Sequence, residues 1–173
     1  ILGQSGVISL AAETISLTNT EVSAKNASTQ SDASDGGSVT AIDIGASDGD
    51  LDLAGSIVEA NTSGTQNAGN VELTGKNIDL DNTAISSATS FLNESSATGD
   101  LVAGAAGSIS IDAEGVANPN GAVSLSRSTA LTATTTGSGD AGSIALSGNS
   151  ISVRGEFDDR VTIASESLQS NSG

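Results

Sequence analysis

Gly107-Ser-Ile-Ser-Ile111 belongs to a pattern, Gly-x-[Ile/Val]-x-[Leu/Ile/Ala], that occurs five times in this chain of 173 residues. The other four copies are Gly6-Val-Ile-Ser-Leu10, Gly37-Ser-Val-Thr-Ala41, Gly69-Asn-Val-Glu-Leu73 and Gly142-Ser-Ile-Ala-Leu146. Their leading glycines are 31, 32, 38 and 35 residues apart. A structural unit that returns at such a period and tolerates insertions is typical of a solenoid. A solenoid of this kind indicates a scaffold or a surface more than a catalyst.

Each copy is followed by two further short runs in which apolar and polar residues alternate. The second runs are Ile15-Ser-Leu17, Leu51-Asp-Leu53, Ile78-Asp-Leu80, Val123-Ser-Leu125 and Ile151-Ser-Val153. The third runs of the first four units begin at Val22, Val58, Ile85 and Leu131. In the fifth unit the third run is Val161-Thr-Ile163, which an insertion displaces along the chain. Strict alternation over such short stretches predicts β-strands with one buried face.

The residues between these runs predict tight corners at a fixed register. Two residues after the second run come Asn19, Gly55, Asn82, Arg127 and Gly155. Four of these five are Gly or Asn, which adopt a left-handed backbone at the lowest cost. Ala12, Gly75 and Gly148 occupy matching positions between the first and second runs, and they predict a similar corner there.

We therefore expect an all-β chain that forms a right-handed parallel β-helix of about five coils, each with three short strands. The right-handed winding is expected because connections between parallel strands of one sheet are almost always right-handed. The repeat units are 6–36, 37–68, 69–106, 107–141 and 142–173, in one segment, 1–173, of a longer chain or filament. One interior column is predicted to contain Ile8, Val39, Val71, Ile109 and Ile144. A second is predicted to contain Ile15, Leu51, Ile78, Val123 and Ile151.

Two structural alternatives remain open at this stage. A β-sandwich is also built from short alternating strands, but it does not require a corner residue repeated five times. Disorder is the other alternative, because the Gly-, Ser- and Asn-rich loops are low in complexity. The regular apolar ladder argues against disorder of the whole chain.

Composition excludes several functional classes. The chain has no Cys, His, Met, Trp or Tyr, and this removes most proton-transfer and nucleophile chemistry. Its net charge of −16 argues against binding to nucleic acid or to anionic membranes. No run of 18 apolar residues is present, so no membrane-spanning helix is expected.

Gln66-Asn-Ala-Gly-Asn-Val-Glu-Leu73 and Gly139-Asp-Ala-Gly-Ser-Ile-Ala-Leu146 resemble the repeat regions of filamentous-haemagglutinin-like adhesins, which bacteria export by two-partner secretion. The similarity extends from about Gly6 to Ser165. It implies an extracellular or cell-surface fibre that acts in attachment, aggregation or matrix formation. The partners implied are host or neighbouring-cell glycans or proteins, with end-to-end self-association or continuation of the same chain, and no nucleic acid or membrane insertion.

One acidic stretch resembles a calcium loop. Asp48, Asp50 and Asp52 alternate, and Glu59 follows at the twelfth position. The sixth position should be Gly but is Leu53, so an exposed acidic strand face is the preferred interpretation. Asp32 and Asp35 lie in a loop and are further candidates for the same site. A calcium-stabilised binding module therefore remains an alternative function, and no metal site is predicted.

A second alternative is a carbohydrate-active enzyme on a β-helix, which would need paired carboxylates in a cleft. Asp158 and Asp159, beside Arg154 and Arg160, form the one cluster of mixed charge, and we interpret it as a solvated inserted loop. Arg154-Gly155-Glu156 is only a weak match to integrin-binding tripeptides. Asn26, Asn61 and Asn93 begin glycosylation acceptor patterns that chance explains. We predict no catalytic residue, no cofactor and no enzyme activity.

Overall fold

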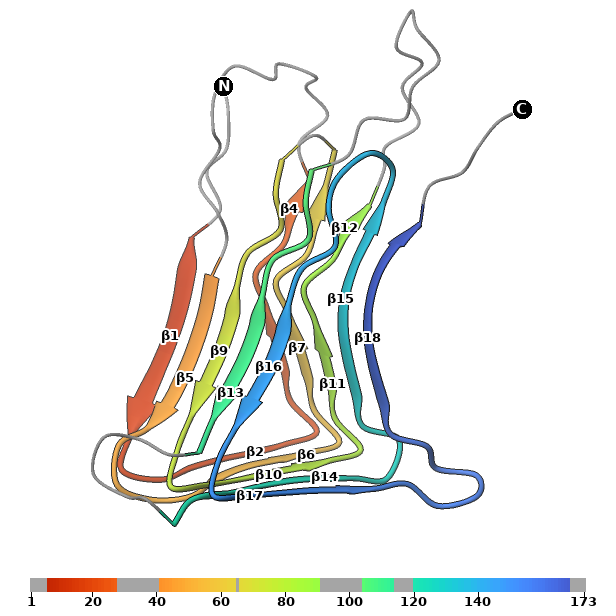
Figure 1. The fold of residues 1–173 in the computed structure, drawn as a ribbon. Helices are drawn as coiled ribbons and strands as arrows, with labels where there is room; N and C mark the ends of the chain where they lie inside the picture. The colour runs from red at the N-terminus through yellow and green to blue at the C-terminus, as the bar shows by residue number, and fades with distance from the viewer. Residues whose placement is uncertain (1–5, 28–40, 65, 91–103, 114–119, 169–173) are drawn as a thin grey trace, which may run out of the picture.

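The chain forms a parallel β-helix with three walls (Figure 1). The structure is a computed structural model, and it describes residues 6–27, 41–64, 66–90, 104–113 and 120–168. Within these residues every regular element is a β-strand, and strands of successive coils pair in parallel. In the same residues no helix is long and apolar enough to cross a membrane.

Each wall takes one strand from every coil. The first wall contains β1 (Val7–Ala12), β5 (Ala41–Ala46), β9 (Val71–Thr74), β13 (Ile109–Asp112) and β16 (Ile144–Ser147). The second contains β2 (Ile15–Thr18), β6 (Leu51–Ala54), β10 (Asn77–Asp81), β14 (Ala122–Ser126) and β17 (Ser150–Arg154).

The third wall contains β3 (Glu21–Ser23), β7 (Ile57–Glu59), β11 (Ala84–Ser86), β15 (Ala130–Thr136) and β18 (Thr162–Leu168). Three two-residue strands extend it: β4 (Asn26–Ala27), β8 (Thr62–Ser63) and β12 (Thr89–Ser90). The long strand β15 pairs with both β11 and β12, so these two strands together correspond to one strand of the next coil.

The registers confirm most of the predicted interior columns. The second-wall column contains Ile15, Leu51, Ile78, Val123 and Ile151, as predicted. In the third wall Val22, Val58, Ile85, Leu131 and Ile163 stack on one another, so the last strand is displaced as expected. These columns repeat because inward and outward residues alternate along every strand.

The predicted position of Val39 in the first-wall column is wrong. Ile42 pairs with both Ile8 and Val71, and Val39 itself lies outside the described residues. The described strand of the second coil thus begins at Ala41, the last residue of the Gly37–Ala41 motif. This register places Ile42 and Ile44 inside, where both are buried, and it buries more apolar area than Val39 and Ala41 would.

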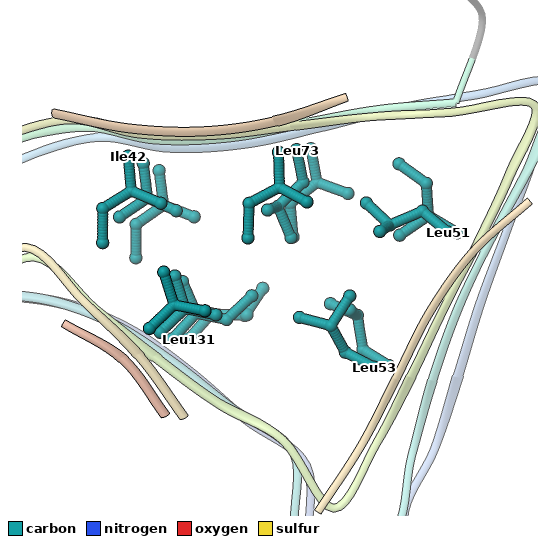
Figure 2. Close-up of a cluster of buried hydrophobic side chains, with 14 of the residues drawn as sticks. Ile42, Leu51, Leu53, Leu73 and Leu131 are labelled. Atoms are coloured by element: carbon teal, nitrogen blue, oxygen red, sulfur yellow. The ribbon is translucent and has the colours of Figure 1, made fainter. Parts of the chain in front are cut away.

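The interior is a single aliphatic core with a triangular section (Figure 2). Ile42 and Leu73 point inward from the first wall, and Leu51 and Leu53 point inward from the second. Leu131 points toward them from the third wall. All five side chains are at most 1% exposed. Stacked Ile, Leu and Val fill this narrow section, so the fold needs no aromatic residue in the described core.

The corner between the second and third walls is left-handed in four coils. The φ angles there are 51° at Asn19, 61° at Gly55, 49° at Asn82 and 38° at Arg127. Gly155 does not share this conformation, so that part of the prediction is wrong. The inserted residues 155–161 carry the chain around the fifth corner instead.

The corner between the first and second walls differs from the prediction as well. None of Ala12, Gly75 and Gly148 has a positive φ. Gly75 serves close packing, since a Cβ at this position would lie 3.2 Å from the Cβ of Leu51 in the preceding coil. A value that short forces neighbouring atoms to move, so the constraint on Gly75 is steric contact between coils and not backbone conformation.

Buried hydroxyl groups occupy the corner between the second and third walls in the second, third and fourth coils. Ser56, Thr83 and Thr129 are at most 1% exposed and stack in successive coils. Ser56 Oγ donates to Leu17 O at 3.0 Å, Thr83 Oγ1 to Leu53 O at 2.8 Å and Thr129 Oγ1 to Leu80 O at 3.0 Å. Each bond joins a corner to the preceding coil, so these hydroxyls bind coil to coil where the apolar columns stop.

Candidate functional site

The four residues of the calcium-like spacing, Asp48, Asp50, Asp52 and Glu59, do not form a group placed to hold a metal ion. Asp50 accepts a hydrogen bond from Asn77 Nδ2 at 2.8 Å, and Asp52 lies on the outer face of β6. Glu59 belongs to the third wall, where Lys25 Nζ lies 2.5 Å from Glu59 Oε2. The stretch is strand and corner rather than a wrapping loop, because Leu51 and Leu53 are buried in the core.

Among the described residues no group of three or more acidic side chains is placed to hold a metal ion. The other two candidates, Asp32 and Asp35, lie outside the described residues. Lys25 contributes to this arrangement, because its ammonium pairs with Glu59 and, at 3.5 Å, with Glu21. These carboxylates raise the pKa of Lys25 above its ordinary value, Glu59 being the main cause. Glu59 therefore acts as the ion-pair partner of Lys25.

Carboxylates of adjacent coils stand next to each other on the outer faces. Asp52 pairs in register with Asp79 on the second wall, and Asp43 pairs with Glu72 on the first. Partial burial raises the pKa of Asp52, and the neighbouring carboxylates of Asp79 and Asp50 raise it further. Like charges opposite each other on one face destabilise a sheet. These rows are therefore an electrostatic cost of an acidic surface.

The mixed-charge cluster Arg154–Arg160 forms an ordered turn that projects from the fifth corner (Figure 1). Glu156 N donates to Asp159 O at 3.0 Å, and Asp159 N donates to Glu156 O at 3.2 Å. Ser128 Oγ of the preceding coil donates to Asp159 Oδ1 at 3.0 Å. Phe157 at its tip is 93% exposed, and Asp158 is exposed beside it. The two aspartates thus lie on a turn that protrudes from the fifth corner.

The three asparagines that begin glycosylation acceptor patterns lie in different surroundings. Asn61 is half-buried, and its Oδ1 accepts hydrogen bonds from Ser86 Oγ and Ala88 N, both at 2.9 Å. It therefore bridges two coils. Asn26 begins β4, and Asn93 lies outside the described residues.

Asparagine bridges of this kind were not foreseen from the sequence. Asn67 Oδ1 accepts a hydrogen bond from Ala105 N at 2.8 Å, and Asn70 Oδ1 accepts one from Ser108 N at 2.8 Å. Both acceptors lie just before β9, and both donors lie just before β13 in the next coil. The signal in the sequence is that polar residues recur just before the Gly-x-Ile motif. From the sequence alone, these residues predict only a loop.

Two coil faces have no described strand on their outer side. β16, β17 and β18 of the fifth coil each pair on one side with the fourth coil, and β1, β2 and β3 of the first coil pair with the second. On the fifth coil, Ile151 is 47% exposed, Val153 49% and Ile163 44%. Their equivalents in the third coil, Ile78, Leu80 and Ile85, are at most 1% exposed. The apolar columns therefore reach solvent on the fifth coil.

Comparison of the chain with protein-family models, with curated proteins and with solved structures found no match.

Proposed function

We propose that this chain is a structural segment of an extracellular β-helical fibre or adhesin of a bacterium, acting in attachment, aggregation or matrix formation. The observation that supports the proposal best is the continuity of the fold along one axis. Three parallel ladders and their apolar columns run through all five coils without interruption. At about 4.8 Å per coil these five coils span roughly 24 Å, and further coils would lengthen the rod without altering its section.

The mechanism is mechanical. The ladder hydrogen bonds run along the rod axis, so tension on the fibre is shared among three walls. The hydroxyl bonds of Ser56, Thr83 and Thr129 and the amide bridge of Asn61 add links between coils. The net charge of −16 keeps such rods soluble and apart from one another. Contacts with glycans or proteins of other cells would be made by outward residues and loops.

The experiment is surface display on a bacterium that lacks adhesins. The chain is fused to a heterologous membrane anchor, and cell aggregation and binding to host cells or abiotic surfaces are measured. We expect both to exceed the values for cells that display the anchor alone. The matched control is Ile78→Asp, which disrupts the rod and leaves every outward side chain in the sequence. Equal aggregation and binding by the chain, the control and the bare anchor would contradict the proposal.

A further inference from the structure

We propose that the turn of residues 155–161 binds a protein on the surface of another cell, and that Phe157 at its tip enters an apolar pocket whose rim carries Lys or Arg side chains. This inference rests on the proposed function, and it specifies which outward residues of the rod make the contact. The turn belongs to the side of the rod and to none of its three walls, since β17 ends at Arg154 and β18 begins at Thr162.

The turn has a defined conformation of its own. Reciprocal backbone hydrogen bonds of 3.0 and 3.2 Å join Glu156 and Asp159, and they close the two-residue tip between them. The two limbs of the turn lie close together, because a Cβ at Gly155 would be 3.2 Å from Val161 N. Val161 itself packs against the core at the base of the turn. A preformed turn loses little conformational entropy on binding, and this favours affinity.

The neighbouring coil supports the turn without covering its tip. β14 and β15 of the fourth coil pair along β17 and β18. Ser128, which lies between β14 and β15, donates from Oγ to Asp159 Oδ1 at 3.0 Å, so the fourth coil holds one limb of the turn. Phe157 is nevertheless 93% exposed. A further coil on the other side would pair with the same two strands, and the turn projects outward from the corner between them (Figure 1).

The fold gives no reason for a phenylalanine at this position. A side chain that is 93% exposed buries almost no area within the chain and adds little to its stability. Turn positions favour Gly, Pro, Asn, Asp and Ser, a rule that Asp158 follows and Phe157 does not. Among the described residues Phe157 is the one aromatic side chain. Aromatic residues are enriched in protein interfaces, so a partner can bury this ring where the fold does not.

The shape and charge of the tip define the partner. A single ring on a projecting turn is convex, and such anchors bind in concave, well-packed pockets. Glu156 and Asp158 flank the ring, and both are exposed. Their carboxylates would meet the rim of the pocket, where Lys or Arg supplies complementary charge. The same carboxylates, in a chain of net charge −16, argue against insertion of the ring into an anionic membrane.

The test measures binding of the fluorescently labelled chain to the host cells of the display assay by flow cytometry. Phe157→Ser should weaken binding at least about tenfold, because burial of the ring is lost, and Phe157→Leu should weaken it less. Asp158→Lys should weaken binding and reduce its dependence on salt. The matched control is Ile57→Ser, which removes an apolar side chain that is 41% exposed on the third wall and should bind like the unmodified chain. Circular dichroism checks that each variant folds.

A dye at the tip reports burial directly. The chain has no cysteine, so Phe157→Cys can carry a solvatochromic dye at this position alone. We expect its emission to shift to the blue when the labelled chain binds the cells. The same dye on Ser124→Cys, an outward position of β14, should not shift. Solvent-exposed emission from the dye at position 157 in the bound chain would overturn the proposal.

Treatment of the cells identifies the kind of partner. Protease treatment should abolish binding, enzymatic deglycosylation should leave it intact, and phosphatidylcholine vesicles should not bind the chain. Binding that survives protease, binding that deglycosylation removes, or vesicle binding that requires Phe157 would each overturn the assignment of a protein partner.

The outcomes separate this inference from the proposed function. Equal binding by Phe157→Ser and the unmodified chain would refute the role of the turn and leave the proposed function standing. An unmodified chain that does not bind the cells but still aggregates the displaying bacteria would do the same. A chain that neither binds cells and surfaces nor aggregates bacteria would refute the proposed function, and the role of the turn with it.

Discussion

Substitution of Gly107 by Ala tests why the repeated motif begins with glycine. Gly107 lies at the narrow edge where the segment before β13 approaches the third wall. An added Cβ would collide with the carbonyl of Gly69 in the preceding coil and would lie 2.6 Å from Ser87 Oγ. Ser87 Oγ in turn donates to Gly69 O at 2.7 Å. The new methyl group therefore meets backbone on one side and a bonded hydroxyl on the other.

The magnitude follows from these two contacts. Overpacking of a close-packed site costs about 1–3 kcal/mol. Displacing the hydroxyl of Ser87 from Gly69 O costs about 1 kcal/mol more. Replacing glycine also restricts the unfolded chain, which offsets about 0.4–1 kcal/mol. We expect Gly107→Ala to lower the free energy of unfolding by about 1–3.5 kcal/mol.

Gly6→Ala is the matched control, because Gly6 is the same motif position in the first coil. A Cβ there has no atom within 4 Å, so the substitution should be neutral or stabilise the protein by up to about 1 kcal/mol. Both variants are compared with the parent by urea unfolding followed by circular dichroism, using the midpoint and the slope. Equal midpoints for Gly107→Ala and Gly6→Ala would refute the steric explanation of the motif.

Three further predictions concern the core, the corner and the surface. Ile78→Asp should destabilise the protein by more than about 4 kcal/mol and abolish its β-sheet circular dichroism, because the charge has no partner in that column; retained signal would show that the register is wrong. Thr83→Val should cost about 1–2 kcal/mol in urea unfolding, because the hydrogen bond to Leu53 O is lost; a cost below about 0.5 kcal/mol would argue against a role for the corner hydroxyls. Because the pKa of Asp52 is raised in the folded state, the folded protein binds this proton more tightly than the unfolded chain does. The resulting contribution to stability is complete below the ordinary pKa of 3.8 and is lost as the pH rises through the folded-state pKa. Asp52→Asn should therefore stabilise the protein near neutral pH by less than about 1 kcal/mol, seen as a slightly higher melting temperature. The melting temperature of the variant should also increase less than that of the parent as the pH is lowered. Parallel curves of melting temperature against pH for the two proteins would contradict this prediction.

The strands and most of the interior columns were predictable because burial on one face imposes a period of two residues. Ile15, Ile78 and Val123 show this period in short runs, and they stack as predicted. The left-handed corners at Asn19 and Asn82 were predictable for a local reason too, since few residue types adopt that conformation at low cost.

The candidate sites were less predictable, because they depend on which wall each residue joins. Asp52 and Glu59 have calcium-like spacing along the chain, but they belong to different walls and have different neighbours. Glu59 pairs with Lys25 of the preceding coil, a contact that spacing along the chain does not reveal. The turn at Phe157 was visible as an insertion, whereas its anchoring by Ser128 was not.

The sequence by itself determined that this protein is a stack of three-walled coils, because alternation and corner residues are local properties that recur in every unit. Only the tertiary structure decided that Ile42 rather than Val39 enters the first column, since both registers alternate and the choice depends on the total area buried against other coils. It also decided the role of the motif glycine. Gly107 is required by the backbone of Gly69 lying against it, and Gly6, with the same local sequence pattern, has no such neighbour.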